Sequence, residues 1–326
     1  MRLPRKTVAR SVEELDRLRP LWKELFRYSP KTMFQRFEWN RLAAEIFRDR
    51  LSPMVCVAES DNGAAIIPAA IHRGESRLEL LGENLFDYRD LLHAGDEDAL
   101  RVAWRMLADI GLPLSVNAVQ PENAAACWRQ FKPMVFARAP WVDADSVTAE
   151  HFRSLHTRAG RQFWRMQRKG VRLHRYSGSE SERVSRIYQL KCDQLAGDAN
   201  NVFRDQRRRD FMVAVAAIEA EKCQVFTLED AEGCIVAGLV TFLDGDIRRF
   251  YTIYFNPGWA VYSPGVALVF EATALSLEQG LSCDYMTGEY PYKLRFANAS
   301  RMLYRVEASP AQLAAVAQGP TTRKIA

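Results

Sequence analysis

Apolar residues recur along the chain with two different spacings, one typical of helices and one typical of strands. Together these spacings predict a mixed α/β protein. The first helical pattern begins at Ser11-Val12-Glu13-Glu14, a capping box, and ends at Pro30. Two strand patterns flank Asp61-Asn62-Gly63, which is typical of a hairpin turn. Further helices are expected over 35–47, 98–110 and 122–131, and further strands over 78–81, 114–119 and 134–137.

The residues from 151 to 169 predict one long helix with two distinct faces. The apolar face consists of Phe152, Leu155, Ala159, Phe163 and Met166. The basic face consists of Arg158, Arg161, Arg165 and Arg168. A second basic cluster consists of Arg204, Arg207, Arg208 and Arg209. Both basic groups have two interpretations, a solvated surface or a contact for a phosphate-rich ligand.

The order of elements in the first half recurs in the second, which suggests a faint internal duplication. After the long helix we expect strand 171–176, helices after Ser179 and Asp205, strands 225–228 and 235–243, and a last strand 302–308. Between the halves, residues 139–145 contain a proline and clustered acids, which are typical of a connection. We therefore expect two domains, residues 1–145 and 146–326.

Composition narrows the class of protein without identifying a ligand. The chain has 326 residues, of which 48% are hydrophobic and 26% charged, and this suits two globular domains. The net charge of +5 is compatible with an anionic ligand but too small to indicate DNA binding. No apolar run has membrane-spanning length, and no signal core follows the N-terminus. No C-x-x-C pair and no metal-ligand spacing of histidines occur, so we expect a cytoplasmic protein with reduced thiols, no metal and no membrane contact.

The stretch from 249 to 293 carries the strongest candidate chemistry. An aromatic strand over 249–255 is broken by Asn256-Pro257-Gly258. Ser263-Pro264-Gly265 then opens an apolar helix, which Gly280 ends. Backbone N–H groups and the positive end of the dipole at such a helix start suit a diphosphate. The alternative is an ordinary cap and turn.

The following strand, predicted over 283–287, leads into a segment rich in acidic, phenolic and amine groups. These residues are Asp284, Glu289, Tyr290, Tyr292 and Lys293. Loops that follow strands are often polar without having a function. This segment alone therefore does not define a reaction.

In series, the aromatic strand, the helix start Y-S-P-G and the segment D-x-x-x-G-x-x-x-Y-K resemble the CelD-like branch of the GNAT acyltransferase superfamily, which is related to the Fem-type aminoacyltransferases. The resemblance extends to Leu81–Asp90 and to the helix near Arg161, and so covers most of the chain through short motifs. It implies an α/β (α+β) fold with two GNAT-like domains in tandem, each a mixed, mostly antiparallel sheet flanked by helices. It also implies acetyl-CoA or another acyl-CoA as the donor.

The resemblance assigns CoA binding to the helix start. Ser263 belongs to this group, and Gly265, Val266 and Ala267 would donate backbone N–H groups to the diphosphate. The first half differs here, because three acids lie at the corresponding helix start, within His93–Asp98. Acids at that position would repel a diphosphate, so we expect only the second half to hold CoA.

The resemblance also suggests catalytic roles. Lys293 would neutralise a phosphate or a developing oxyanion, and its alternative is a solvated lysine. Asp284 would act as a base, orient Lys293 or form an ordinary ion pair. Tyr292 would protonate the leaving thiolate or simply pack. Tyr251 and Tyr254 point to opposite faces of their strand, and we favour Tyr254 as the one that faces the acceptor.

The acceptor side is assigned to residues beyond a strand of the first half. Asp87, Tyr88 and Asp90 would border the acceptor, together with Glu289. Their acidic groups suit a cationic amine. The alternative for Asp90 is a carboxylate that caps a turn.

Three hypotheses follow. The first is an acyl-CoA-dependent N-acyltransferase, in the simplest case an acetyltransferase, acting on an amine of a small molecule, sugar or peptide. The second is a Fem-type transferase that uses aminoacyl-tRNA, suggested by the arginine face of the long helix. The third is a non-catalytic protein of GNAT shape in a polysaccharide-making system. The acceptor, the acyl chain length, the general base and the oligomeric state stay open.

Overall fold

The computed structural model describes residues 4–29 and 32–318. The chain forms two compact units, and we describe each by itself. Unit 1 contains the residues up to Ala137 together with those from Met302 onward, whereas unit 2 is the continuous segment Arg138–Arg301. This division differs from the expected domains in two places. The first boundary lies within a strand instead of near residue 145, and the last strand and helix belong largely to unit 1.

The strand at the boundary explains the first difference. The segment 139–145 was expected to be a connection, but β7 runs over Met134–Val142. Two of its residues, Trp141 and Val142, pair with Asp284 and Cys283 of β12. Pairing with a strand that is distant in sequence therefore overrides the local preference for a loop.

Unit 1 contains a mixed, mostly antiparallel sheet. Its strands are β1 (Arg5–Ala9), β2 (Leu51–Glu59), β3 (Gly63–His72), β4 (Arg77–Leu80), β6 (Leu114–Val119) and β13 (Ala299–Ala308), in that order across the sheet. The one parallel pairing among them joins β4 to β6. The short strand β5 (Leu92–Gly95) pairs with the first residues of β3, from Gly63 to Ile66.

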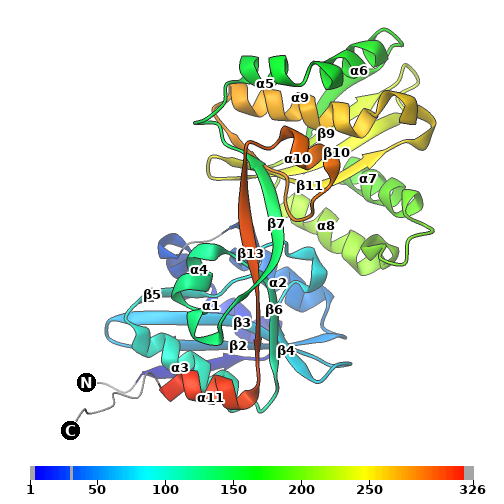
Figure 1. The fold of residues 1–326 in the computed structure, drawn as a ribbon. Helices are drawn as coiled ribbons and strands as arrows, with labels where there is room; N and C mark the ends of the chain where they lie inside the picture. Colours follow the sequence, from blue (N-terminus) through cyan, green and yellow to red (C-terminus); the bar gives the residue numbers. More distant parts are fainter. Residues whose placement is uncertain (1–3, 30–31, 319–326) are drawn as a thin grey trace. The chain divides into compact units, whose positions relative to one another are not determined.

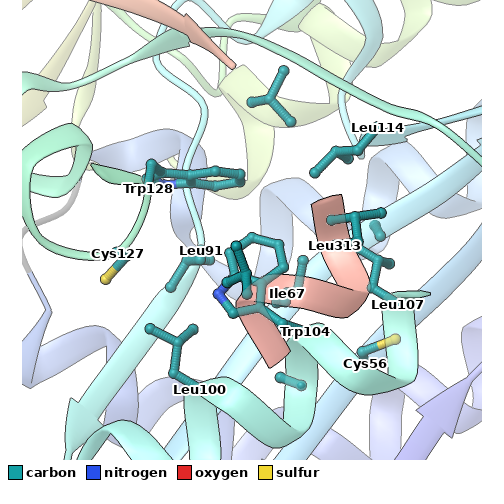
Figure 2. Packing of buried hydrophobic residues seen from close by; sticks show 14 of the residues in the cluster. Cys56, Ile67, Leu91, Leu100, Trp104, Leu107, Leu114, Cys127, Trp128 and Leu313 are labelled. Atoms are coloured by element: carbon teal, nitrogen blue, oxygen red, sulfur yellow. The ribbon is translucent and has the colours of Figure 1, made fainter. Parts of the chain in front are cut away.

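Helices cover both faces of this sheet. Helices α1 (Val12–Tyr28) and α2 (Phe37–Ile46) pack together on one face. Helix α3 (Glu97–Ala108) packs on β2 and β3 from the other face, and α11 (Pro310–Gln318) packs on α3. Helix α4 (Pro121–Ala126) lies on the same side of the unit (Figure 1). The core under α3 is built around two tryptophans, Trp104 and Trp128, whose rings lie 5.1 Å apart (Figure 2).

Unit 2 contains a second mixed, mostly antiparallel sheet. Its strands are β8 (Arg172–Ser177), β9 (Cys223–Glu229), β10 (Ile235–Asp244), β11 (Ile247–Phe255), β12 (Ser282–Asp284) and β7. The pairings are antiparallel except that β11 and β12 run parallel.

Helices α5 (Ala149–Leu155), α6 (Thr157–Gln167) and α9 (Pro264–Glu278) lie on one face of this sheet, and α7 (Ser181–Gln194) and α8 (Gln206–Ile218) lie on the other (Figure 1). The short helix α10 (Pro291–Phe296) follows β12. Single turns of 3-10 helix occur at Met33–Gln35, Glu83–Leu85, Arg129–Phe131 and Val202–Arg204, and a longer one at Pro257–Tyr262.

The expected fold class is confirmed, because both units consist of mixed, mostly antiparallel strands flanked by helices. One expected element is wrong. The helix predicted over 151–169 is broken at His156, whose backbone has a ψ of +36° and leaves the helical path. Leu155, assigned to the apolar face, is 61% exposed beside this break. No helix in the described part of the chain combines the length and apolar character needed to cross a bilayer.

Asp90, expected near the acceptor, lies inside unit 1 and is only 2% exposed. Its Oδ1 accepts hydrogen bonds from the Trp128 indole Nε1 at 2.8 Å and from the Leu91 amide at 2.9 Å. Burial raises the pKa of this carboxyl from 3.8 to about 7. The position favours the alternative interpretation, a carboxylate that serves the fold.

We expect Asp90 to make the folded state less stable as pH rises. Because the native pKa is raised, the native state binds the proton more tightly than the unfolded chain does. Its contribution is therefore fully present below pH 3.8 and is lost as pH approaches 7. Urea unfolding at several pH values should show this slope in the wild type and a flatter one in Asp90→Asn. An identical pH dependence in both proteins would contradict the assignment.

Candidate active site

The sheet of unit 2 opens where β11 and β12 part. The two parallel strands pair at three positions, Ile247 with Ser282, Arg248 with Cys283 and Arg249 with Asp284. Strand β12 ends at Asp284, whereas β11 continues to Phe255. The carboxyl ends of parallel strands are where ligands of open α/β sheets commonly bind.

A buried ion pair marks the point of separation. Arg249 and Asp284 are 2% and 3% exposed, and the Arg249 Nη1 lies 2.5 Å from the Asp284 Oδ2. Arg249 also binds Asp244 through Nε at 2.8 Å. The second oxygen of Asp284 accepts the Met286 amide at 2.7 Å. Met286 has a φ of +62°, an uncommon conformation for a residue other than glycine. The pair therefore fixes the chain where it turns away from β11.

The structure shows one of the contacts considered for Asp284. Of the three roles considered, the structure shows the ion pair, with Arg249 as partner. Arg249 was not singled out from the sequence. The sequence did contain a signal, since Arg249 lies within an otherwise aromatic and β-branched strand. A charged residue is buried in such a strand only when it is paired, so its position predicts a buried ion pair.

The start of α9 lies just beyond the end of β11. Gly265 is buried, and a side chain there would meet Ile253 and Phe255 of β11 at 3.3–3.5 Å. The amides of Gly265 and Val266 precede the first helical hydrogen bond, so neither has an acceptor within α9. Two N–H groups at the positive end of a 15-residue helix thus suit an anion.

One of the predicted CoA contacts, the Ala267 amide, needs correction. The Ala267 amide donates to the Ser263 carbonyl at 3.0 Å, because it makes the first hydrogen bond of α9. It therefore has no spare proton for a diphosphate. Ser263 occupies the N-cap position in a left-handed conformation, with a φ of +49°, and its side chain makes no capping bond. Its side chain is exposed at the helix start.

Cationic side chains from α6 and from the turn that follows it approach the same place. The Arg165 guanidinium lies 5.2 Å from the centre of the Tyr262 ring, and the Lys169 ammonium lies 5.9 Å from it. Tyr262 immediately precedes Ser263, so both cations are close to the start of α9. Arg165 belonged to the predicted basic face, but Lys169 was not recognised, because only packing of α6 on the turn before α9 brings it there.

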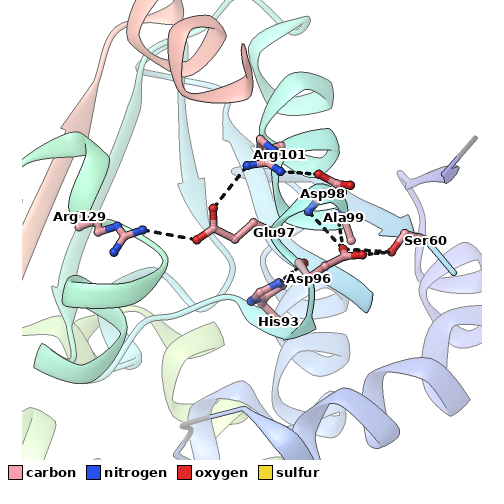
Figure 3. A network of polar contacts seen from close by, with 8 residues as sticks. All are labelled: Ser60, His93, Asp96, Glu97, Asp98, Ala99, Arg101 and Arg129. Carbon is pink, nitrogen blue, oxygen red and sulfur yellow. Dashed lines mark hydrogen bonds and ion pairs between the residues drawn. The ribbon is translucent and has the colours of Figure 1, made fainter. Parts of the chain in front are cut away.

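The equivalent helix start in unit 1 is occupied by its own side chains (Figure 3). Asp96 accepts the amides of Asp98 and Ala99 at 3.2 and 3.5 Å and binds the Ser60 hydroxyl at 3.1 Å. Glu97 binds Arg101 and Arg129, each at 3.4 Å. Carboxylates already satisfy the amides and the dipole of α3, so this start is unsuited to a second anion.

Tyr254 lies on the opposite face of β11 from α9. It is nearly buried and lines a pocket of about 580 Å³ between α7 and the ends of β10 and β11. Burial raises the pKa of its phenol. The sequence favoured Tyr254 over Tyr251 for the acceptor side, and the structure places it in a pocket. Most of the other pocket residues were not identified, because α7 has the polar pattern of an ordinary surface helix.

Lys293 is buried within α10, and its ammonium donates to the Thr287 carbonyl at 2.7 Å. It is therefore not the solvated lysine of the alternative interpretation. Tyr292 is half-buried against the core of unit 2, and burial raises the pKa of its phenol. Glu289 is exposed and lies 3.4 Å from Arg138.

The remaining candidates lie in unit 1 or on the surface of unit 2. Tyr88 is buried beside Phe34, and its carbonyl accepts the Gln35 side chain at 2.8 Å. Asp87 is half-buried next to it. The cluster at 204–209 is largely engaged with its own loop, since Arg204 binds the Ala196 carbonyl at 3.0 Å.

Comparison with known proteins agrees with this geometry. Residues 161–294 match the family described as acetyltransferase (GNAT) domain. FemX is 9% identical, covers 96% of this chain and 99% of its own, and has a TM-score of 0.59. A tandem GNAT protein from the clavulanic acid biosynthesis pathway is 11% identical, with coverage of 98% and 100% and a TM-score of 0.53. L-PGS from Bacillus licheniformis is 13% identical, with coverage of 92% and 96% and a TM-score of 0.58.

No curated protein matches the chain. The matched segment lies inside unit 2 and runs from α6 to α10. This confirms the resemblance inferred from the sequence. The solved structures are similar over nearly the whole chain, which shows that the fold is that of tandem GNAT and Fem-type proteins.

We expect Arg249→Met to lower the free energy of unfolding by about 3–5 kcal/mol, because it removes the cation shared by Asp284, which is buried, and Asp244, which is half-buried. The double variant Arg249→Met/Asp284→Asn should lose less than the sum of the two single changes, since the second change removes one of the uncompensated charges. Urea unfolding of all four proteins measures this. Strictly additive losses would show that the two side chains are not coupled.

Proposed function

We propose that this protein is an acyl-CoA-dependent N-acyltransferase, with acetyl-CoA as the simplest donor. The observation that carries the proposal is the start of α9, which offers the Gly265 and Val266 amides next to the end of β11. Arg165 and Lys169 add two positive charges near that point. Two amides, two cations and a helix dipole together fit the diphosphate of CoA.

The chemistry needs little from the protein beyond positioning. A thioester is already activated, so the amine nitrogen attacks its carbonyl carbon directly. A C–N bond forms and the C–S bond breaks. The nitrogen loses one proton and the leaving thiolate gains one, which gives an amide and free CoA. The chain must hold both reactants in line and supply a route for these protons.

The predicted catalytic residues take different parts in this proposal. Tyr292 keeps its proton at neutral pH, because burial raises its pKa, and so it suits the donation of a hydrogen bond to the leaving thiolate. Tyr254 faces the acceptor side as a hydrogen-bond donor. Lys293 and Asp284 act as positioning residues, because Lys293 holds the Thr287 carbonyl and Asp284 holds the Met286 amide.

Unit 1 is proposed to bind no CoA, because Asp96 and Glu97 occupy the start of α3. It would serve as a scaffold. The predicted acceptor residues Asp87 and Glu289 keep that role as a proposal, whereas the burial of Tyr88 and Asp90 suits a structural role better.

Removing the two cations near the α9 start should weaken acetyl-CoA binding. We expect the double variant Arg165→Gln/Lys169→Gln to bind acetyl-CoA about tenfold more weakly at low salt, with a smaller difference at high salt because such contacts are screened. Isothermal titration calorimetry measures both effects. Arg158→Gln is the matched control, since Arg158 is an exposed arginine two turns earlier on α6. Wild-type protein that is folded but does not bind acetyl-CoA would refute the proposed donor.

One observation favours aminoacyl-tRNA as a second candidate donor. Trp164 is 54% exposed on α6, with the Arg168 guanidinium 4.8 Å from its ring. An exposed aromatic residue among arginines is typical of surfaces that bind single-stranded nucleic acid.

Filter binding with bulk tRNA tests the second candidate. If tRNA is the donor, retention should be strong and salt-sensitive, and both Trp164→Ala and Arg158→Gln should reduce it. If acetyl-CoA is the donor, Arg158→Gln should leave its binding unchanged and tRNA retention should be weak. The control variant of the calorimetry thus separates the two donors.

A further inference from the structure

We propose that the acceptor is an amine that carries its own carboxylate, namely a free amino acid, and that it binds in the α7 pocket. The α7 pocket is the cavity that contains Tyr254. This inference rests on the proposed acyltransferase function, because it treats the pocket as the acceptor side of that reaction. It goes further by assigning a chemical class to the acceptor.

The size and lining of the α7 pocket suit a small polar molecule. Its volume of about 580 Å³ lies within the usual range for small-molecule sites. The residues that matter for recognition are Glu180, Glu182, Arg186, Leu190, Ile235 and Tyr254. Charged groups of both signs therefore surround a short apolar wall.

The charges at the α7 pocket are not all available to a ligand. The Arg183 guanidinium lies 2.5 Å from the Glu229 carboxylate and stacks on the Tyr176 ring at 3.9 Å. It is held by the fold. Arg186 is exposed, and in the described part of the chain it forms no ion pair with Glu180, Glu182 or any other carboxylate. One cation and two carboxylates thus remain to meet a ligand.

Arg186 also faces the buried phenol of Tyr254. Its positive charge favours the ionised form of that phenol, while burial and Asp193 act in the opposite direction, and the net effect is a raised pKa. The phenol therefore keeps its proton at neutral pH and serves as a hydrogen-bond donor. A guanidinium and a phenolic O–H next to each other can together bind one carboxylate.

The carboxylates of Glu180 and Glu182 supply the other half of the recognition. Both lie at the start of α7 and are exposed to the pocket. They attract an ammonium group, and a carboxylate beside that group can accept its proton before the nitrogen attacks. The same two charges disfavour a polyphosphate, so the α7 pocket is unsuited to the donor.

The α7 pocket and the proposed donor site lie on opposite faces of one strand. Ile253 and Phe255 of β11 face Gly265 at the start of α9. Tyr254, between them in sequence, points to the other face and into the pocket. A donor that extends along the end of β11 and an acceptor in the α7 pocket would therefore be separated by the thickness of a single strand.

Equilibrium binding tests the recognition without any turnover. L-leucine and L-leucinamide have nearly the same shape, but only the first carries a carboxylate. We expect calorimetry to show that L-leucine binds wild-type protein at least about tenfold more tightly than L-leucinamide. Arg186→Gln should abolish that preference, and Glu182→Gln should weaken both ligands. Arg175→Gln is the control, because Arg175 is an exposed arginine on β8 that does not line the pocket.

Equal affinity of wild-type protein for the two ligands, or an unchanged preference in Arg186→Gln, would overturn the inference. Mass spectrometry of the products formed with acetyl-CoA separates this failure from that of the proposed function. Acetylation of L-leucinamide and L-leucine at equal rates would support the proposed acyltransferase function and refute the proposed zwitterionic acceptor. Selective acetylation of L-leucine, lost in Arg186→Gln, would support both.

Discussion

The ion pair between Arg249 and Asp284 is the constraint on which the rest of unit 2 depends. It lies at the last paired position of β11 and β12, and both partners are almost completely buried. Charges at such a position are tolerated only when each is paired and hydrogen-bonded, which Asp244 and the Met286 amide ensure. Because the chain must leave β11 at this point, the sheet opens beside the start of α9, and the end of β11 is exposed to ligands on two faces.

The two units show how one architecture serves different chemistry. Both place a helix start next to a mixed sheet, but the amides of α3 are occupied by Asp96, whereas the first amides of α9 have no acceptor within their helix. The three acids at the start of α3 therefore make this helix start unsuited to binding an anion. The fold alone does not specify which helix start can accept an anion, and the side chains at that start do.

Features that depend on neighbouring residues in sequence were predicted well. The Ser11 cap, the hairpin at 61–63 and the start of α9 at Pro264 all depend on local preferences, and the structure shows each of them. The boundary near residue 145 was wrong because β7 finds a partner that is distant in sequence.

The candidate site was predicted less completely, for the same reason. A phosphate-binding helix start has a sequence signature, but the approach of Lys169 to Tyr262 depends on how α6 packs. The α7 pocket depends on which of several surface charges are already held by others. Arg183 forms an ion pair with Glu229, whereas Arg186 does not. The local sequence around the two arginines does not predict this difference.

The interruption of unit 1 by unit 2 has a consequence for how the protein is made. Val306 of β13 and Leu313 of α11 complete the core around Trp104, yet they are synthesised after all of unit 2 (Figure 2). During translation, part of the apolar core of unit 1 therefore stays exposed until β13 and α11 have been synthesised. Unit 2 is continuous in sequence, so it can fold before then. Unit 1 begins first and finishes last, which makes it the half that would most need a chaperone's protection.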